Sequence, residues 1–109
     1  LFIVLKNIFN NIKKYSETKK DCEVSVVENK QYKTISIKDF GVGIPEQIID
    51  IVDQPFVRNK KNRVSGFGLG LAICKKVVVC HGGEFKVSNH NQGGALFIIK
   101  LPHKIRVDA

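Results

Sequence analysis

The sequence predicts an α+β fold in which helices cover one face of a mostly antiparallel sheet. Apolar residues recur at helical spacing in 1–15 and again in 69–80. Alternating apolar and polar residues form two hairpins, made of the segments 22–27 with 32–39 and 85–88 with 95–101. Hairpin strands are antiparallel, and each helix has one apolar stripe to bury, so two packed layers satisfy both patterns.

The composition is that of one globular domain. Of 109 residues, 43% are hydrophobic and 26% are charged, and no apolar run has the length of a membrane span. The three cysteines form no C-x-x-C pair, which disfavours a zinc site or a disulfide framework and suits a reducing cytosol. Residue 1 is a leucine inside an apolar helical pattern, so we expect the chain to be a fragment of a longer protein.

The net charge of +8 is compatible with nucleic acid, an acidic membrane surface or a polyanionic small ligand as the binding partner. Basic residues gather in 58–63, just before a glycine run, and in 13–20, around the end of the first helix. Either cluster taken alone is typical of a solvated face.

The remaining segments have simpler signals. Pro45 opens a short helix at 46–52, as proline does at a first helical position. The stretch 53–65 has no periodicity, and long irregular segments in compact domains are usually functional. Pro102 ends the last strand, so we expect a domain over 1–102 and a polar tail over 103–109 that frays.

Three alternate glycines, Gly66, Gly68 and Gly70, lead directly into the second helix. Glycines let backbone amides approach a ligand, and the helix start adds unpaired amides and a positive dipole end. The run therefore suits a phosphate, although a glycine run alone is a weak signal.

Four motifs in fixed order resemble those of the ATP-binding catalytic domain of sensor histidine kinases, within the superfamily of gyrase, the Hsp90 chaperones and MutL. The resemblance covers nearly the whole chain and implies a Bergerat-type two-layer sandwich with a mixed, mostly antiparallel sheet. The matching residues are Asn7, Asn11, Lys14 and Tyr15 in the N box, Asp39, Gly41, Gly43 and Ile44 in the first glycine box, Pro55, Phe56 and Arg58 in the phenylalanine box, and Gly66, Gly68, Gly70 and Leu71 in the second glycine box.

The resemblance implies that the first glycine box binds the base. Asp39 would accept a hydrogen bond from the exocyclic amine of adenine, where guanine has a carbonyl. Gly41 and Gly43 would let the chain pass close to the base, and Ile44 and Tyr15 would line the pocket.

It also implies a magnesium and phosphate site. Asn11 would bind Mg²⁺ through its side-chain oxygen, with Asn7 assisting and Lys14 neutralising phosphate charge. Arg58 and its neighbours in 54–65 would form a lid that nucleotide orders. The phosphates of ATP would lie against the second glycine box, comprising Gly66, Phe67, Gly68, Leu69, Gly70 and Leu71.

The activity implied is binding of Mg²⁺ and ATP and transfer of the γ-phosphate to a histidine. Superfamily members that hydrolyse ATP have a glutamate at the position of Asn7, and an amide cannot act as a general base, which favours transfer. None of the three histidines is followed by the acid and proline of a phosphoacceptor box. We therefore expect the acceptor domain, and the first strand of this domain, to lie upstream.

For the parent protein, the resemblance implies a homodimeric bacterial sensor in the membrane, with this domain in the cytoplasm and a response regulator as partner. The fragment itself would be a monomer, and no nucleic acid is implied.

Two positions depart from the family pattern. Ile12 stands where alanine is usual and adds bulk beside the magnesium ligand, and Ala95 stands where a threonine or serine often supports the aspartate. The alternative function is therefore a degenerate, non-catalytic module of the same fold that senses nucleotide or binds a partner. A nucleic-acid-binding domain, supported only by the charge, is more remote.

Three other nucleotide-binding classes are excluded by their motifs. A protein kinase would have an H-R-D catalytic loop before Asp39-Phe40-Gly41, and none is present. A P-loop would place lysine after the last glycine, where Leu71 stands. A Rossmann domain needs its glycine fingerprint early in a parallel βαβ unit, which the hairpins contradict.

Overall fold

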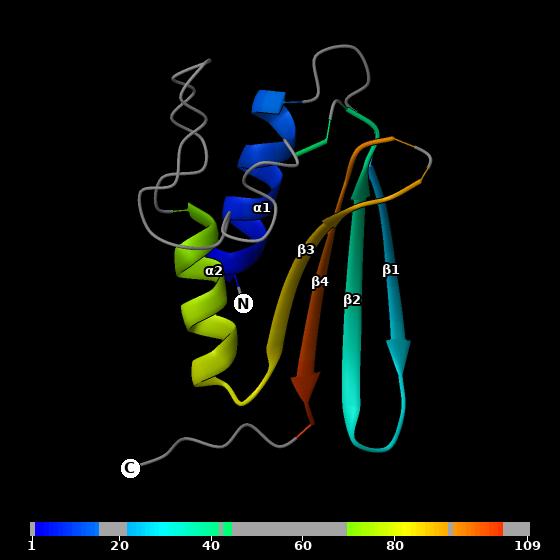
Figure 1. Cartoon of the computed structure of the whole chain (residues 1–109). Coiled ribbons are helices and arrows are strands. Elements are labelled where there is room, and N and C mark those ends of the chain that lie inside the picture. The colour runs from blue at the N-terminus through cyan, green and yellow to red at the C-terminus, as the bar shows by residue number, and fades with distance from the viewer. Residues whose placement is uncertain (1, 16–21, 42, 45–69, 92, 104–109) are drawn as a thin grey trace.

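The computed structural model describes residues 2–15, 22–41, 43–44, 70–91 and 93–103. Figure 1 shows the described strands side by side, with both helices on one side of them. The α+β prediction is confirmed. The elements are helix α1 (Phe2–Tyr15), strands β1 (Cys22–Glu28) and β2 (Tyr32–Asp39), helix α2 (Gly70–Cys80), and strands β3 (Glu84–Asn89) and β4 (Ala95–Pro102).

The predicted helix 46–52, the phenylalanine box and the lid 54–65 lie outside the described residues. The predicted bounds of the six described elements agree with the structure to within about two residues, which is the usual precision of helix and strand ends.

The four described strands form one sheet in the order β1-β2-β4-β3, and every pairing among them is antiparallel. Each predicted hairpin pairs within itself, and β2 joins β4 at the centre of the sheet. The register aligns buried residues of the three strands β2, β4 and β3 in rows: Ile35 with Ile99 and Phe85, and Ile37 with Phe97 and Val87.

These rows and the two helices make the core. Helix α1 contributes Val4, Ile8 and Ile12, and α2 contributes Leu71, Cys74 and Val78. The side-chain spacing on each helix places these residues on one face, as the apolar repeat predicts. Burial of an aliphatic side chain of this size contributes about 1.5–3 kcal/mol, so this interface is a large part of what holds the helices on the sheet.

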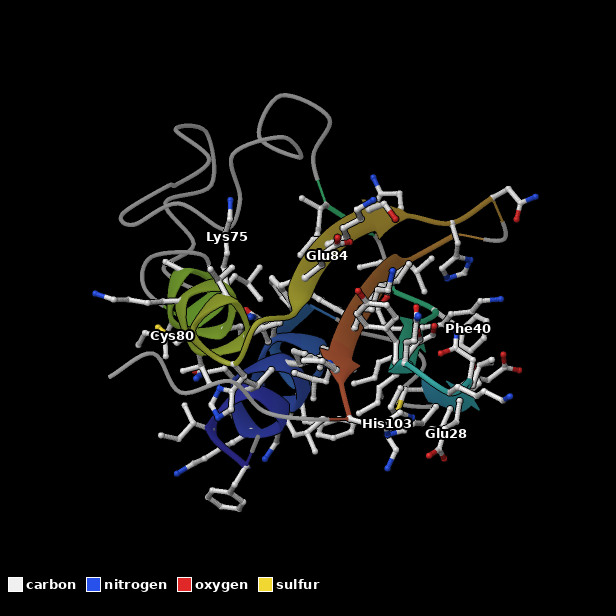
Figure 2. All side chains as sticks on the ribbon, turned by 90° about the horizontal axis from the view of Figure 1, so that it is seen from below. Glu28, Phe40, Lys75, Cys80, Glu84 and His103 are labelled. Atoms are coloured by element: carbon white, nitrogen blue, oxygen red, sulfur yellow. The ribbon has the colours of Figure 1, made fainter. Side chains whose placement is uncertain are left out.

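The three cysteines are free, in agreement with the sequence. Cys74 donates from its Sγ to the carbonyl of Val4 at 3.5 Å, and burial raises the pKa of this thiol to about 11. It therefore stays protonated near neutral pH and packs as a core residue. Cys80, by contrast, lies on the outer side of α2, away from the sheet (Figure 2).

Strand β1 differs from the other three because helix-facing residues in its middle are exposed. Val24 and Val26 pair with Ile37 and Ile35 and therefore share their face, yet they are 52% and 55% exposed. Among the described residues, the two helices lie over the other strands and leave this edge uncovered.

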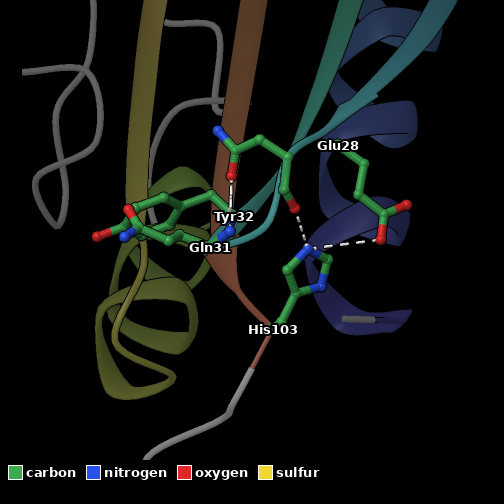
Figure 3. A network of polar contacts seen from close by, with 5 residues as sticks. Glu28, Gln31, Tyr32 and His103 are labelled. Carbon is green, nitrogen blue, oxygen red and sulfur yellow. Dashed lines mark hydrogen bonds and ion pairs between the residues drawn. The ribbon is translucent and has the colours of Figure 1, made fainter.

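A polar network holds together the end of the sheet where β2 begins and β4 ends (Figure 3). The Asn29 Oδ1 atom accepts hydrogen bonds from the amides of Gln31 and Tyr32 at 2.8 and 2.7 Å, which closes the turn between β1 and β2. The ring Nε2 of His103 donates to the Asn29 carbonyl at 2.7 Å and lies 3.4 Å from Glu28 Oε1. His103 is thus anchored, whereas the rest of the predicted tail, 104–109, lies outside the described residues.

Candidate functional site

Asp39 is a buried acid at the end of β2. It continues the helix-facing row of Ile35 and Ile37, because alternate strand residues share a face, and it is only 5% exposed. Its Oδ1 atom accepts a hydrogen bond from the amide of Ala95 at 2.8 Å and another from the amide of Gly41 at 3.1 Å. Among the described residues, both hydrogen bonds to this carboxylate end on Oδ1, so Oδ2 is the oxygen available to a ligand.

The hairpin between β3 and β4 contacts the residues that follow Asp39. Asn89 accepts a hydrogen bond from the Ile44 amide through Oδ1 and donates to the Ile44 carbonyl through Nδ2, both at 2.8 Å. His90 Nε2 donates to the backbone carbonyl of Asp39 at 2.7 Å. Sequence reasoning missed both residues, because their partners lie 45 and 51 positions away and the local pattern signals only a turn.

Gly94 lets this hairpin approach Asp39. A Cβ atom at Gly94 would lie 2.7 Å from the Asp39 Oδ1 atom and would also collide with the Asp39 carbonyl oxygen. The φ angle of Gly94 is +106°, a conformation that other residues rarely adopt. Glycine is therefore required here for the backbone of β4 to reach the acid.

The paired asparagines of α1 meet the start of α2. Asn11 is 6% exposed, and no hydrogen bond joins its side chain to another described residue. The Asn7 amide nitrogen donates to the Ile3 carbonyl at 3.0 Å. A Cβ atom placed on Gly70 would lie 3.2 Å from Asn7 Oδ1 and 3.9 Å from Asn11 Nδ2. The structure therefore brings both asparagines to the first residue of α2.

The other predicted site residues divide into two groups. Ile44 is buried beside the end of β2, whereas Leu71 is a fully buried core residue, so only its backbone could meet a ligand. The side chains of Lys14 and Tyr15, together with Arg58, Gly66, Phe67, Gly68 and Leu69, lie outside the described residues.

The two departures from the family pattern have structural explanations. Ile12 is 4% exposed and packs in the core, so its bulk is directed into the apolar interface. Ala95 lacks a hydroxyl, but its backbone amide makes the shorter of the two hydrogen bonds to Asp39. Asp39 is thus supported by a main-chain donor.

A cavity of about 290 Å³ lies elsewhere, beside the C-terminal end of α2. Its walls include Val77, Leu101 and Pro102, with Lys33, His81 and His103 as basic side chains. None of the predicted site residues lines it, so it is separate from the candidate site.

Two features are absent from the part of the chain that the structure describes. It contains no group of three or more His, Cys, Asp or Glu residues placed to hold a metal ion. No described helix has the length and apolar character needed to cross a membrane.

Comparison with known proteins adds to this geometry. Residues 1–105 match the family described as histidine kinase-, DNA gyrase B-, and HSP90-like ATPase. The sensor protein KdpD of Clostridium acetobutylicum is 38% identical over 105 residues, which are 94% of this chain and 12% of that protein. The sensor protein kinase WalK of Staphylococcus epidermidis is 38% identical over 110 residues, covering 96% of this chain and 18% of the kinase. The chain is thus similar to a small part of each relative.

The fold comparison gives the same result. The structure of the mycobacterial sensor histidine kinase MprB is similar with a TM-score of 0.74 at 30% identity, covering 95% of this chain and 72% of that one. The order of motifs, the antiparallel sheet with both helices on one face, and these similarities agree. The chain therefore belongs to the family of histidine kinase-, DNA gyrase B- and HSP90-like ATPases, and over nearly its whole length it is similar to the ATP-binding domain of sensor histidine kinases.

Proposed function

We propose that this domain selects ATP through Asp39, holds the phosphates with Mg²⁺ beside Asn7, Asn11 and Gly70, and supplies the γ-phosphate to a histidine in another domain of the same protein. The observation that carries the proposal is the state of Asp39. It is a buried acid with one oxygen fixed by two backbone amides and the other left for a ligand.

The base would be recognised by hydrogen-bond complementarity. A carboxylate only accepts hydrogen bonds, so Oδ2 suits the exocyclic amine of adenine and repels the carbonyl that guanine has at the same place. A hydrogen bond to a charged group contributes about 1.5–3 kcal/mol. Because Ala95 and Gly41 already orient the carboxylate, little ordering cost remains when the base binds.

The phosphate end would be completed by the ligand. The amide oxygens of Asn7 and Asn11 are hard ligands of the kind that Mg²⁺ prefers, and Gly70, which has no Cβ atom, lies next to both side chains. Bound there, Mg²⁺ would bridge phosphate oxygens and neutralise the charge that develops during transfer. Gly70 is also the first residue of α2, whose unpaired amides favour an anion.

Transfer to a histidine is supported over hydrolysis by the chemistry of Asn7. Its amide cannot abstract a proton from water, and its nitrogen already donates to Ile3. The three histidines of the chain each direct a ring nitrogen at a backbone carbonyl, those of Val77, Asp39 and Asn29. These contacts are structural, which favours an acceptor histidine in a different domain.

The same proposal extends to the parent protein. The relatives are sensor kinases several times longer than this chain, so we propose further domains, including a dimerising acceptor domain. We further propose a response regulator as the final phosphate acceptor and a cytoplasmic position for this domain in a membrane-bound sensor. The alternative of a degenerate module is weakened by the packing of Ile12 and the amide of Ala95, since neither departure removes a predicted ligand.

Calorimetric titration tests the central claim. We expect the chain to bind ATP with Mg²⁺ at least about tenfold more tightly than GTP, since one charged hydrogen bond corresponds to about that factor. Asp39→Asn keeps the shape but presents an NH₂ donor to the base, so the preference for ATP should disappear. Equal affinity of the unaltered chain for both nucleotides would remove Asp39 from this role.

A second measurement distinguishes a catalytic kinase domain from a non-catalytic module of the same fold. In the full-length protein, labelled γ-phosphate should appear on a histidine. ATP binding without any transfer would instead indicate the non-catalytic alternative.

A further inference from the structure

We infer that Asn89 and His90 are positioning residues that hold the base-binding turn and thereby set the purine preference of the site. The base-binding turn is defined here as Asp39, Phe40, Gly41, Gly43 and Ile44. The inference rests on the proposed role of Asp39. Neither Asn89 nor His90 belongs to the four motifs that the sequence reveals.

The turn begins where the backbone ladder between β2 and β4 stops. Strands β2 and β4 pair as far as Lys38 with Leu96, so the main chain of the turn receives no further ladder partners from β4. The turn is partly buried, with Asp39 and Ile44 inside, and backbone groups that lose contact with water must still be paired. The structure uses side chains at the end of β3 for this purpose.

Asn89 pairs with one residue in both directions. Its Oδ1 accepts from the Ile44 amide and its Nδ2 donates to the Ile44 carbonyl, each at 2.8 Å. This carboxamide acts as a backbone peptide group would in an antiparallel ladder. An aspartate would lack the donor, and an alanine would leave both Ile44 groups without this partner.

His90 holds the other end of the turn. Because a carbonyl oxygen can only accept, the ring nitrogen Nε2 carries the proton in the 2.7 Å contact with the Asp39 carbonyl. The other ring nitrogen, Nδ1, is buried and has no hydrogen-bond partner among the described residues. Burying an unpaired nitrogen costs free energy. The ring is nevertheless held in place by the Nε2 hydrogen bond and by an edge contact with Phe40, in which the two ring centroids are 5.6 Å apart.

The contacts form a clamp on the acid. His90 binds the Asp39 main chain, Ala95 binds the Asp39 carboxylate, and Asn89 binds the last residue of the turn. All three donors or acceptors belong to the single hairpin of β3 and β4, seen above the end of β2 in Figure 1. The position of Asp39 Oδ2 relative to a base is therefore fixed by this hairpin.

A positioning role predicts a loss of selectivity as well as a loss of affinity. If the turn relaxes, the carboxylate can move away from the base, so the bond to adenine weakens and the repulsion of guanine also falls. A purely structural role would lower the affinity for both nucleotides by the same factor. The ratio of ATP to GTP affinity therefore separates the two roles.

The experiment titrates the full chain with ATP and, separately, GTP, both with Mg²⁺, and records the thermal unfolding midpoint of every variant. Asn89→Ala removes the paired contacts with Ile44. Asn91→Ala is the matched control, because Asn91 is an exposed asparagine in the same hairpin. His90→Gln keeps an N–H donor at similar reach without the ring, and His90→Phe keeps a ring without the donor.

We expect Asn89→Ala to weaken ATP binding about tenfold and to lower the ATP-to-GTP ratio by a similar factor. His90→Phe should act in the same direction, His90→Gln should retain most of the ratio, and Asn91→Ala should change neither quantity. If Asn89→Ala does not fold, the pair of His90 variants decides, since only His90→Gln keeps the hydrogen-bond donor and only His90→Phe keeps a ring against Phe40.

Two results would overturn the inference in distinguishable ways. If the unaltered chain prefers ATP and both Asn89→Ala and His90→Phe keep that preference, the hairpin only supports the fold and the proposed function stands. If the unaltered chain does not prefer ATP, the role of Asp39 fails, and the inference fails with it.

Discussion

The two ends of the candidate site, proposed to bind the base and the phosphates, are built in opposite ways. At the base end, comprising Asp39, Asn89, His90 and Ala95, hydrogen bonds of 2.7 to 2.8 Å link the four residues to each other or to the adjoining turn. At the proposed phosphate end, comprising Asn7, Asn11 and Gly70, the Asn11 side chain is buried without a described partner, and Gly70, which has no Cβ atom, lies next to both amides.

The difference follows from what each end of the site would have to recognise. A base is recognised by the exact direction of one hydrogen bond, which requires a fixed carboxylate. A metal ion and a polyphosphate are strongly charged, so the amide groups that would bind them can remain without hydrogen-bond partners until the ligand arrives. Polar groups at the base end should therefore contribute to both stability and binding, whereas those at the phosphate end should contribute to binding alone.

The largest expected effect is at the base end. Gly94→Ala places a Cβ atom against the backbone and carboxylate of Asp39, and Gly94 also has a positive φ. Overpacking and backbone strain together should cost about 3 kcal/mol of unfolding free energy. For a chain of this size, that corresponds to a fall in the unfolding midpoint of more than about 10 °C.

Gly93→Ala is the matched control for that variant. Gly93 has a φ of +87°, but a Cβ atom there would have no neighbour within 4 Å. Only the backbone term of about 1–2 kcal/mol should remain. Equal destabilisation by the two variants, measured by thermal unfolding, would show that the close approach to Asp39 is unimportant.

The sequence predicts the two ends unequally well. Periodicity locates every described helix and strand, and the spacing of Asn7 and Asn11 places both on α1 because residues four apart share a helix face. The clamp on Asp39 was not predictable, since Asn89 and His90 act across the sheet on residues 45 and 51 positions away. Such contacts depend on strand register, which a local pattern does not specify.

The role of Ala95 shows the same limit. From the sequence, alanine at position 95 implies the loss of a hydroxyl group that would support Asp39. In the structure, its backbone amide bonds the acid at 2.8 Å, a contact that any residue except proline could make. Likewise, the sequence predicts that the bulky Ile12 side chain lies beside the proposed metal ligand Asn11, but the packing of α1 directs that side chain into the core.

A smaller effect is expected at the phosphate end, and it should separate binding from stability. Asn11→Ala removes an amide that makes no hydrogen bond to a described residue, so the unfolding midpoint should change little. The increase in ATP affinity produced by Mg²⁺ should fall on the order of a hundredfold, as expected for loss of a metal ligand. Adenosine binding, which needs no metal, should persist.

Asn10→Ala controls for the loss of an asparagine from α1, because Asn10 is the exposed neighbour of Asn11. It should change neither stability nor the magnesium effect. If Asn11→Ala keeps the full magnesium effect in calorimetry, the assignment of Asn11 to the metal is wrong.

The smallest effect should come from adding a methyl group at Gly70, where the start of α2 meets Asn7 and Asn11 of α1. In Gly70→Ala the new methyl group would lie 3.2 Å from Asn7 Oδ1, a distance that a slight side-chain shift can relieve. Because Gly70 is the first residue of α2, the preference of helix interiors for alanine over glycine applies only weakly there, so stability should be nearly unchanged. The methyl group nevertheless occupies the space beside both amides, and ATP affinity with Mg²⁺ should fall about three- to tenfold. Because the new methyl group would meet Asn7 and Asn11 and leave the hydrogen bonds to Asp39 in place, the preference for ATP over GTP should be retained. A variant that binds both nucleotides as tightly as the unaltered chain would place the phosphates away from the first residue of α2.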